Sequence, residues 1–409
     1  MRSVRIRLSI MMFLQFFIWG AWYVTVGNYM TGNGMFDQVS WAYTVGPIAA
    51  IISPFFLGIV ADRFFATERV LAAMHLLGAA AMFCVPYVAE VGPWAMIACL
   101  MVHMLAYMPT LGLTNTLAFH HITDQERDFP LIRVFGTIGW IVANWVVSKW
   151  LVGDATAVQF YVTGIAGTVL AVYSLTLPHT PPPAAGKKAS LREILGVDAL
   201  RMLRDRPFSV FILGSFLICI PLAAYYAYAP VFSSKVGFEN VAFVMSFGQI
   251  SEIVFMVLMP LFFRFLGVKW MLLVGMFAWV LRYGLFAAAD EGNVQWMVLL
   301  GILLHGICYD FFFVTGFIYT DKKCSNEIRG QAQGLLVLVT QGFGLGMGAQ
   351  LVGRLVTRYT SGTELPVTDW GSFWSVPMIM AGVVMLLFAI LFNDRTVTDH
   401  VEAAQDTAQ

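Results

Sequence analysis

The sequence predicts an all-α membrane protein with twelve transmembrane helices in two pseudo-symmetric six-helix bundles. Of its 409 residues, 59% are hydrophobic and only 12% are charged, a composition too apolar for a surface that faces water. Twelve apolar runs are each long enough to cross a bilayer, whose hydrocarbon core takes about 20 helical residues. One long polar, basic segment divides these runs into two groups of six. These three observations together fix the predicted class.

The twelve runs are predicted to be helices, because a helix satisfies its own backbone hydrogen bonds in lipid. Their length argues against a β-barrel, whose strands are short and alternate apolar with polar residues. In chain order they cover residues 8–30, 41–61, 69–88, 94–119, 132–152, 158–177, 208–233, 241–264, 269–289, 294–320, 331–356 and 372–392.

The distribution of Lys and Arg predicts the orientation. One side collects the basic N-terminus and nearly all basic loops, including Lys187, Lys188, Arg192, Arg201, Arg204 and Arg206. The other side has only Lys149, Lys235, Arg354 and Arg358. Because cytoplasmic loops carry the excess of positive charge, we expect both termini in the cytoplasm. An even number of crossings agrees with this, since it places both termini on the same side.

The polar segment predicts four parts: a six-helix bundle at 1–177, a cytoplasmic linker at 178–207, a second bundle at 208–394 and a tail at 395–409. The linker begins with a Pro-rich stretch, and 190–203 is amphipathic enough for a short helix on the membrane surface. Two six-helix halves joined by a basic linker are the architecture of the major facilitator superfamily, in which substrate lies between the halves near the midplane.

A short loop adds to this resemblance. The run Gly58-Ile-Val-Ala-Asp62-Arg63 is similar to the superfamily's GxxxD(R/K) signature. That resemblance implies a gating role for Asp62 and Arg63, which would latch one conformational state by charge. An ordinary solvated loop is the alternative for the same residues.

Several classes of function are not supported. No nucleophile–base set, HExxH or Walker motif is present, so we expect neither an enzyme nor an ATP-driven pump. The net charge of zero implies no nucleic-acid partner. The five cysteines form no CxxC pair, so neither a disulfide framework nor a zinc site is predicted. No cofactor and no metal are expected, and uphill transport would have to use an ion gradient.

The central candidate site is Gln249-Ile-Ser-Glu252, in the middle of an apolar run. A carboxylate at the bilayer centre costs about 2.5–3.5 kcal/mol on insertion scales. Positions 249 and 252 share one helical face. We interpret this pair as part of a substrate or proton site. A structural bond to a neighbouring helix is the alternative.

A second candidate is the stripe Arg133, Thr137 and Trp140, spaced i, i+4, i+7 on one helix face. A planar cation, a hydroxyl and a large aromatic face suit a ligand with a flat ring and hydroxyl groups. For Arg133, a side chain that reaches to the membrane surface is an equal alternative.

Further polar groups interrupt later runs. His305 and Tyr309 are spaced i, i+4, and Asp310 is turned about 100° from Tyr309. A buried Asp310 needs a partner, for which Arg133, Arg282 or a proton are candidates, and we expect Arg282 to form a charge pair. Tyr225 belongs to a tyrosine cluster between two prolines, which predicts an irregular helix with aromatic groups facing a cavity or gate.

The chain is similar over nearly its whole length to the nucleoside:proton symporter family of bacterial inner membranes. The stretches that carry the resemblance are 14–22 (LQFFIWGAW), 106–115 (AYMPTLGLTN), 128–139 (DFPLIRVFGTIG), 248–252 (GQISE), 309–312 (YDFF) and 332–334 (AQG). The resemblance implies import of nucleosides together with protons across the inner membrane.

The resemblance also assigns site residues. It implies substrate binding by Arg133, Thr137, Trp140, Gln249, Glu252, His305 and Tyr309, with Trp140 where the family usually has Phe and His305 where it has Tyr. Leu222 and Tyr225 stand where the well-characterised branch has Gln and Asn, a departure that resembles the family's less-characterised branch. Tyr225 is therefore included as a substrate contact. Glu252 and Asp310 are the candidates for carrying the proton.

Two alternatives stay open at this stage. One is a proton-coupled importer of another polyhydroxylated solute, such as a sugar or glycoside, and the other is an efflux antiporter. A membrane enzyme or receptor is a remote third, because no catalytic set and no extramembrane domain are visible. The partners we expect are a nucleoside or similar small polar solute, the proton and the lipid bilayer, and we expect a monomer.

Overall fold

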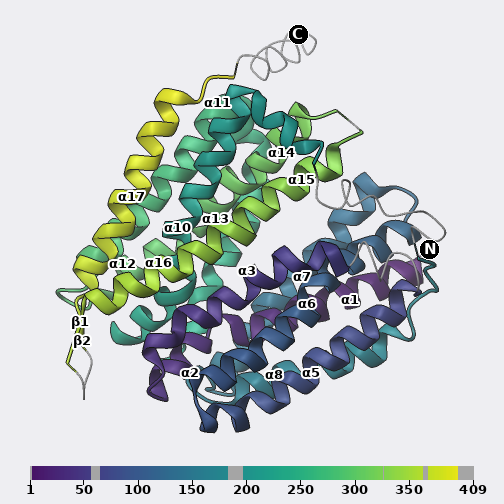
Figure 1. The fold of residues 1–409 in the computed structure, drawn as a ribbon, viewed down its shortest axis with the longest axis horizontal. Coiled ribbons are helices and arrows are strands. Elements are labelled where there is room, and N and C mark those ends of the chain that lie inside the picture. Colours follow the sequence, from purple (N-terminus) through teal and green to yellow (C-terminus); the bar gives the residue numbers. More distant parts are fainter. Residues whose placement is uncertain (1, 57–64, 183–196, 326, 363–366, 395–409) are drawn as a thin grey trace. The chain divides into compact units, whose positions relative to one another are not determined.

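The computed structural model describes residues 2–56, 65–182, 197–325, 327–362 and 367–394. The chain divides into two compact units: unit 1 is Met1–Ser190 with Glu239–Ser246, and unit 2 is Leu191–Phe238 with Phe247–Gln409. Figure 1 colours them from purple and blue (unit 1) to green and yellow (unit 2). The predicted gating pair Asp62 and Arg63 lies outside the described residues, as do most of the linker and the tail 395–409.

Unit 1 is a helical bundle. Its elements are α1 (Arg2–Tyr23), α2 (Val26–Gly32), the 3-10 turn η1 (Phe36–Gln38), α3 (Val39–Phe56), α5 (Thr67–Val91), α6 (Pro93–His121), α7 (Gln125–Asn144), the π-helical η3 (Trp145–Trp150) and α8 (Val158–Ser174). Helix α1 packs against α7 and α8, and α5 packs against α6 and α8. The first run of the sequence is therefore central to this unit.

Glycines let α1 and α7 approach closely. A Cβ on Gly139 would overlap the carbonyl oxygen of Phe13, and a Cβ on Gly20 would lie 2.9 Å from the carbonyl oxygen of Trp140. Without a hydrophobic driving force between helices in lipid, such backbone contact is a main source of association. These contacts set the position of α7, and therefore of its polar stripe, relative to α1.

The remaining helices belong to unit 2, except that residues 241–246 at the start of α11 group with unit 1. They are η4 (Ala199–Arg204, 3-10), α10 (Arg206–Lys235), α11 (Val241–Ala289), α12 (Gln295–Leu303), α13 (His305–Tyr309), η5 (Asp310–Val314, π-helical), α14 (Thr315–Lys323), α15 (Arg329–Val337), η6 (Leu338–Gly344, π-helical), α16 (Leu345–Arg358) and α17 (Trp370–Leu391). A two-residue hairpin pairs β1 (Thr360–Ser361) with β2 (Val367–Thr368) antiparallel, Thr360 opposite Thr368. The part of the predicted linker helix that is described holds only the 3-10 turn η4.

Helix α11 crosses twice. Gly267 has φ 62° and ψ 179° in its middle, a left-handed conformation that Gly adopts without the steric cost of a Cβ. The two halves match the predicted runs 241–264 and 269–289. In the described residues, nine helices are long and apolar enough to span a membrane, with α11 counted once. The apolar helix α8 is shorter, and α3 has 18 described residues. The fold is the twelve-helix, major facilitator type.

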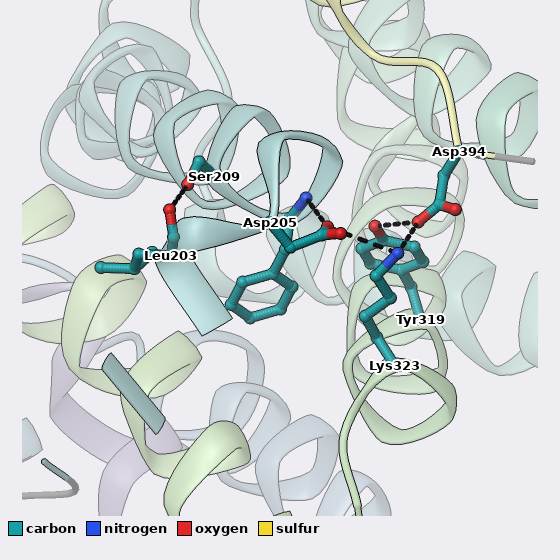
Figure 2. A network of polar contacts seen from close by, with 7 residues as sticks. Leu203, Asp205, Ser209, Tyr319, Lys323 and Asp394 are labelled. Carbon is teal, nitrogen blue, oxygen red and sulfur yellow. Dashed lines mark hydrogen bonds and ion pairs between the residues drawn. The ribbon is translucent and has the colours of Figure 1, made fainter. Parts of the chain in front are cut away.

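A polar network joins three helix ends in unit 2 (Figure 2). Lys323 at the end of α14 donates to Asp394 after α17 at 2.7 Å, and the hydroxyl of Tyr319 donates to the same oxygen at 2.6 Å. Lys323 also lies 3.3 Å from Asp205, whose other role is to cap α10 by accepting from the Phe208 N–H at 3.0 Å. The network ties α10, α14 and the end of α17 together.

Candidate functional site

The polar stripe of α7, Arg133, Thr137 and Trp140, is half-buried. The apolar side chains of Val134, Phe135 and Ile138 beside it are exposed. The guanidinium carbon of Arg133 lies 4.0 Å from the ring centroid of Phe16 on α1. The ring of Trp140 meets Trp19 edge-on, with centroids 5.5 Å apart. Thr137 lies between them in sequence and is half-buried too. The stripe therefore offers a cation and aromatic faces on one side of unit 1.

A hydrogen-bonded core sits near this stripe in unit 1. The amide of Gln15 donates to Thr110 at 2.7 Å and accepts from the ring Nε2 of His75 at 2.8 Å. The hydroxyl of Tyr107 donates to the carbonyl of Gln15 at 2.7 Å. Gln15 is fully buried, and both ends of its amide are engaged. It braces α1, α5 and α6.

Gln249 and Glu252 lie on the first half of α11, where that helix presses on α12 and α13. A Cβ on Gly306 would lie 2.6 Å from backbone atoms of Ser251, and a Cβ on Gly248 would lie 3.1 Å from the Cβ of His305. The hydroxyl of Ser251 donates to the carbonyl of Leu303 at 2.6 Å. This close crossing brings the Glu252 carboxylate to 3.8 Å from the His305 Nε2.

An aromatic and cationic cluster backs His305. The ring of Tyr225 on α10 stacks on His305 with centroids 5.5 Å apart and planes at 17°. The guanidinium of Arg282 lies over the Tyr225 ring at 4.1 Å. Arg282 forms no ion pair with a carboxylate among the described residues, so the expected charge pair is wrong. Its partners are a backbone carbonyl, the Tyr225 ring and the imidazole.

Asp310 opens the π-helical stretch η5 and is fully buried. Neither of its carboxyl oxygens has a hydrogen-bond partner among the described residues. The carboxyl of Glu252 is close enough to interact with it electrostatically. A π-helical turn is rare and frequently lies at a functional site. Asp310 and Glu252 are therefore two neighbouring carboxyls inside the helices of unit 2.

The structure thus gathers five predicted positions within unit 2: Gln249, Glu252, His305, Tyr309 and Asp310, with Tyr225 stacked on His305. Tyr309 is half-buried and contacts His305 at 5.8 Å between ring centroids. Arg133, Thr137 and Trp140 form a separate set in unit 1, and a shared pocket for the two sets stays a prediction. Sequence reasoning missed the backing of His305 by Arg282, although an arginine inside an apolar run was the signal for it.

The described residues contain no group of three or more His, Cys, Asp or Glu side chains that could hold a metal ion. What the unit 2 cluster offers instead is two carboxyls, an amide, an imidazole and aromatic faces in an apolar setting. Such groups bind hydroxyls and flat rings and carry protons.

Comparisons with known proteins give a family and several relatives. The model of the "Nucleoside H+ symporter" family matches residues 2–397. The "Putative nucleoside transporter YegT" of Escherichia coli (strain K12) is 39% identical, with 95% of this chain and 93% of that protein covered. The nucleoside permease NupG of the same organism is 34% identical, with 95% of each chain covered.

Solved structures give the same result. The crystal structure of the nucleoside transporter NupG matches with a TM-score of 0.86 and 32% identity, covering 96% of this chain and all of that one. The crystal structure of a peptide transporter POT in complex with sulfate matches with a TM-score of 0.74 but 12% identity, covering 98% of this chain and 95% of that one. The second match speaks for the fold alone.

Proposed function

This chain belongs to the nucleoside H+ symporter family, and from that membership we propose that it imports nucleosides together with protons by alternating access between its two units. The observation that carries the coupling is a pair of carboxyls on neighbouring segments of unit 2, the fully buried Asp310 and the half-buried Glu252. A carboxyl in an apolar bundle binds a proton readily. Binding the proton removes its charge, and with it the free-energy cost of holding a charged group among apolar helices.

The proposed substrate contacts divide by chemistry. The ribose hydroxyls bond to Gln249 and Glu252, because an amide and a carboxylate accept and donate as vicinal hydroxyls require. The base packs against Trp140, Tyr225 or Tyr309, since a flat heteroaromatic ring stacks on aromatic faces. Arg133 and Thr137 bond to the ligand from unit 1, and His305 completes the wall in unit 2. Asp62 and Arg63 gate one state.

The proton is carried by Glu252 or Asp310. Protonation neutralises the buried charge and permits the loaded carrier to change conformation. Support comes from Asp310, whose two oxygens have no hydrogen-bond donor among the described residues. An ionised carboxylate without donors is costly in an apolar setting, which favours the neutral form.

We further propose the setting. The protein lies in the lipid bilayer of a bacterial inner membrane as a monomer, with both termini in the cytoplasm. Its bundles are 1–177 and 208–394, joined by the cytoplasmic linker 178–207 and followed by the tail 395–409. The excess of Lys and Arg on one side of the crossings supports this orientation.

Uptake by purified protein in proteoliposomes tests the function. We expect radiolabelled nucleosides to accumulate above the external concentration when the inward proton gradient is present, and accumulation to stop when a protonophore collapses it. A sugar panel run in parallel should give no uptake. Nucleoside uptake that ignores the gradient, or the absence of uptake for every nucleoside, would contradict the proposal.

A further inference from the structure

A fully buried arginine stands behind the proposed site in unit 2. Arg282 is 0% exposed and lies in the second half of α11. Its Nε donates to the carbonyl of Gly301 at 2.9 Å, and its Nη2 lies 3.4 Å from the Nδ1 of His305. The guanidinium also covers the Tyr225 ring at 4.1 Å. Arg282 thus contacts α10, α12 and α13 at once.

The contact with His305 fixes which imidazole nitrogen carries hydrogen. A guanidinium is charged at all ordinary pH values and has five N–H donors and no acceptor. The nitrogen facing it must therefore offer a lone pair. A neutral imidazole that accepts at Nδ1 carries its hydrogen on Nε2. A doubly protonated ring would turn an N–H and a positive charge toward the guanidinium, so the cation disfavours that form.

The other side of the ring faces the proposed substrate residue. Nε2 of His305 lies 3.8 Å from Oε2 of Glu252. With hydrogen on Nε2, the imidazole presents its N–H toward the carboxylate. The three side chains therefore follow one another in space: Arg282 contacts one nitrogen of His305, and Glu252 lies beside the other. The buried cation orients the neutral ring, and the ring orients the acid.

The packing around Arg282, His305 and Glu252 holds them in these relative positions. Tyr225 stacks on His305 at 17° between ring planes while its ring also carries the guanidinium, so one aromatic side chain holds both partners. A Cβ on Gly248 would lie 3.1 Å from the Cβ of His305, so α11 and α13 cross in close contact at this point. A guanidinium stacked on an aromatic ring is stabilised by cation–π attraction.

We propose that Arg282 is a positioning residue that holds His305 neutral, in the tautomer with hydrogen on Nε2, so that the Nε2–H of His305 points toward the Glu252 carboxylate and His305 takes no part in carrying the coupling proton. The inference rests on the proposed function for its consequence in transport, but the tautomer itself is a property of the protein alone. It leaves the coupling proton to the two carboxyls, Glu252 and Asp310.

Nitrogen NMR of the purified, ¹⁵N-histidine-labelled protein tests the tautomer without any transport assay. The chain has seven histidines, and the His305 signals are those lost in His305→Gln. At neutral pH we expect the Nδ1 resonance at the position of an unprotonated nitrogen and the Nε2 resonance at that of an N–H. A protonated Nδ1 in the wild-type protein, in either a neutral or a charged ring, would overturn the proposal.

Transport by variants gives a second reading. We expect Arg282→Gln to raise the nucleoside KM by about tenfold or more, the scale of one charged hydrogen bond, with a smaller change in kcat. In His305→Gln the side-chain amide donates without needing a set tautomer. Adding Arg282→Gln in that background should therefore raise KM by much less.

An equal effect of Arg282→Gln in both backgrounds would show a structural role only and overturn the proposal. If Arg282→Gln does not fold, the wild-type NMR measurement still decides. Wild-type protein that shows the expected tautomer but moves no nucleoside would refute the proposed function and leave the tautomer assignment standing. Nucleoside transport with hydrogen on Nδ1 would do the reverse.

Discussion

The carboxylate of Asp154 accepts a hydrogen bond from the backbone N–H of Val241 at 2.6 Å. Asp154 lies in the loop between η3 and α8, and Val241 begins α11, whose first residues group with unit 1. The same oxygen accepts from the Ser148 hydroxyl at 2.9 Å. Asp154 is thus a helix cap supplied from 87 residues away, which no local sequence signal predicts.

Removing this cap should loosen the start of α11. We expect Asp154→Ala to destabilise the purified protein by about 1 kcal/mol, the usual cost of losing a cap, seen as a lower melting temperature in detergent. Asp154→Asn is the matched control, because its amide oxygen still accepts from Val241 and Ser148. Equal melting temperatures for Asp154→Ala and the wild type would show that the cap contributes nothing.

Asp154 also predicts a pH dependence of stability. Burial raises the pKa of its carboxyl above the ordinary value, against the lowering effect of its hydrogen bonds with Ser148, Val241 and Ala242. A folded-state pKa above the unfolded value means that the contribution to stability is full at low pH and is lost as pH rises through the folded pKa.

Melting curves from about pH 4, near the unfolded Asp pKa of about 3.9, up to pH 7 should show this effect. We expect the wild type to lose stability relative to Asp154→Asn as pH rises, because the Asn side chain cannot ionise. A constant difference between the two proteins over that range would contradict the raised pKa.

The crossing of α1 and α7 gives a packing prediction. Gly139→Ala would place a Cβ against the carbonyl oxygen of Phe13, so the helices must separate, and overpacking costs about 1–3 kcal/mol. The matched control is Gly334→Ala in α15, where a Cβ would meet nothing within 4 Å. We expect the melting temperature to fall for the first and to hold for the second. Equal behaviour of the two variants would refute the close crossing.

The Gln15 brace gives a prediction about unit 1. Gln15→Leu leaves His75 and Thr110 without their buried partner, and a buried group left unsatisfied costs about 1–3 kcal/mol. We expect a lower melting temperature and no change in which nucleosides are taken up. Ile10→Ala, on the exposed side of α1, is the control. A change of nucleoside preference in Gln15→Leu would show that Gln15 contacts substrate instead.

Much of the fold could be predicted because the bilayer imposes a length. The apolar runs indicated the crossings, including the two halves of α11, since Lys269 and Gly267 interrupt the apolar pattern there. The apolar run around Gln249 and Glu252 predicted that both lie on one membrane-length helix, which is the first half of α11. Charge bias and apolar length are read from sequence alone.

What the sequence could not show are contacts set by tertiary packing. An arginine inside an apolar run implied a carboxylate partner, but Arg282 is satisfied by the Gly301 carbonyl, the Tyr225 ring and His305. Likewise Gly139 reads as a generic small residue until Phe13 is seen against it. Periodicity places a residue on a helix face but does not say which atoms of another helix meet it.

The central claim is that the carboxyls of Asp310 and Glu252 in unit 2 couple the proton to transport. It is tested most directly by measuring gradient-driven accumulation and nucleoside exchange in Asp310→Asn and Glu252→Gln. We predict that at least Asp310→Asn loses accumulation driven by a proton gradient while keeping nucleoside exchange across the membrane, which requires no net proton movement. Gradient-driven accumulation retained in both variants would contradict the account.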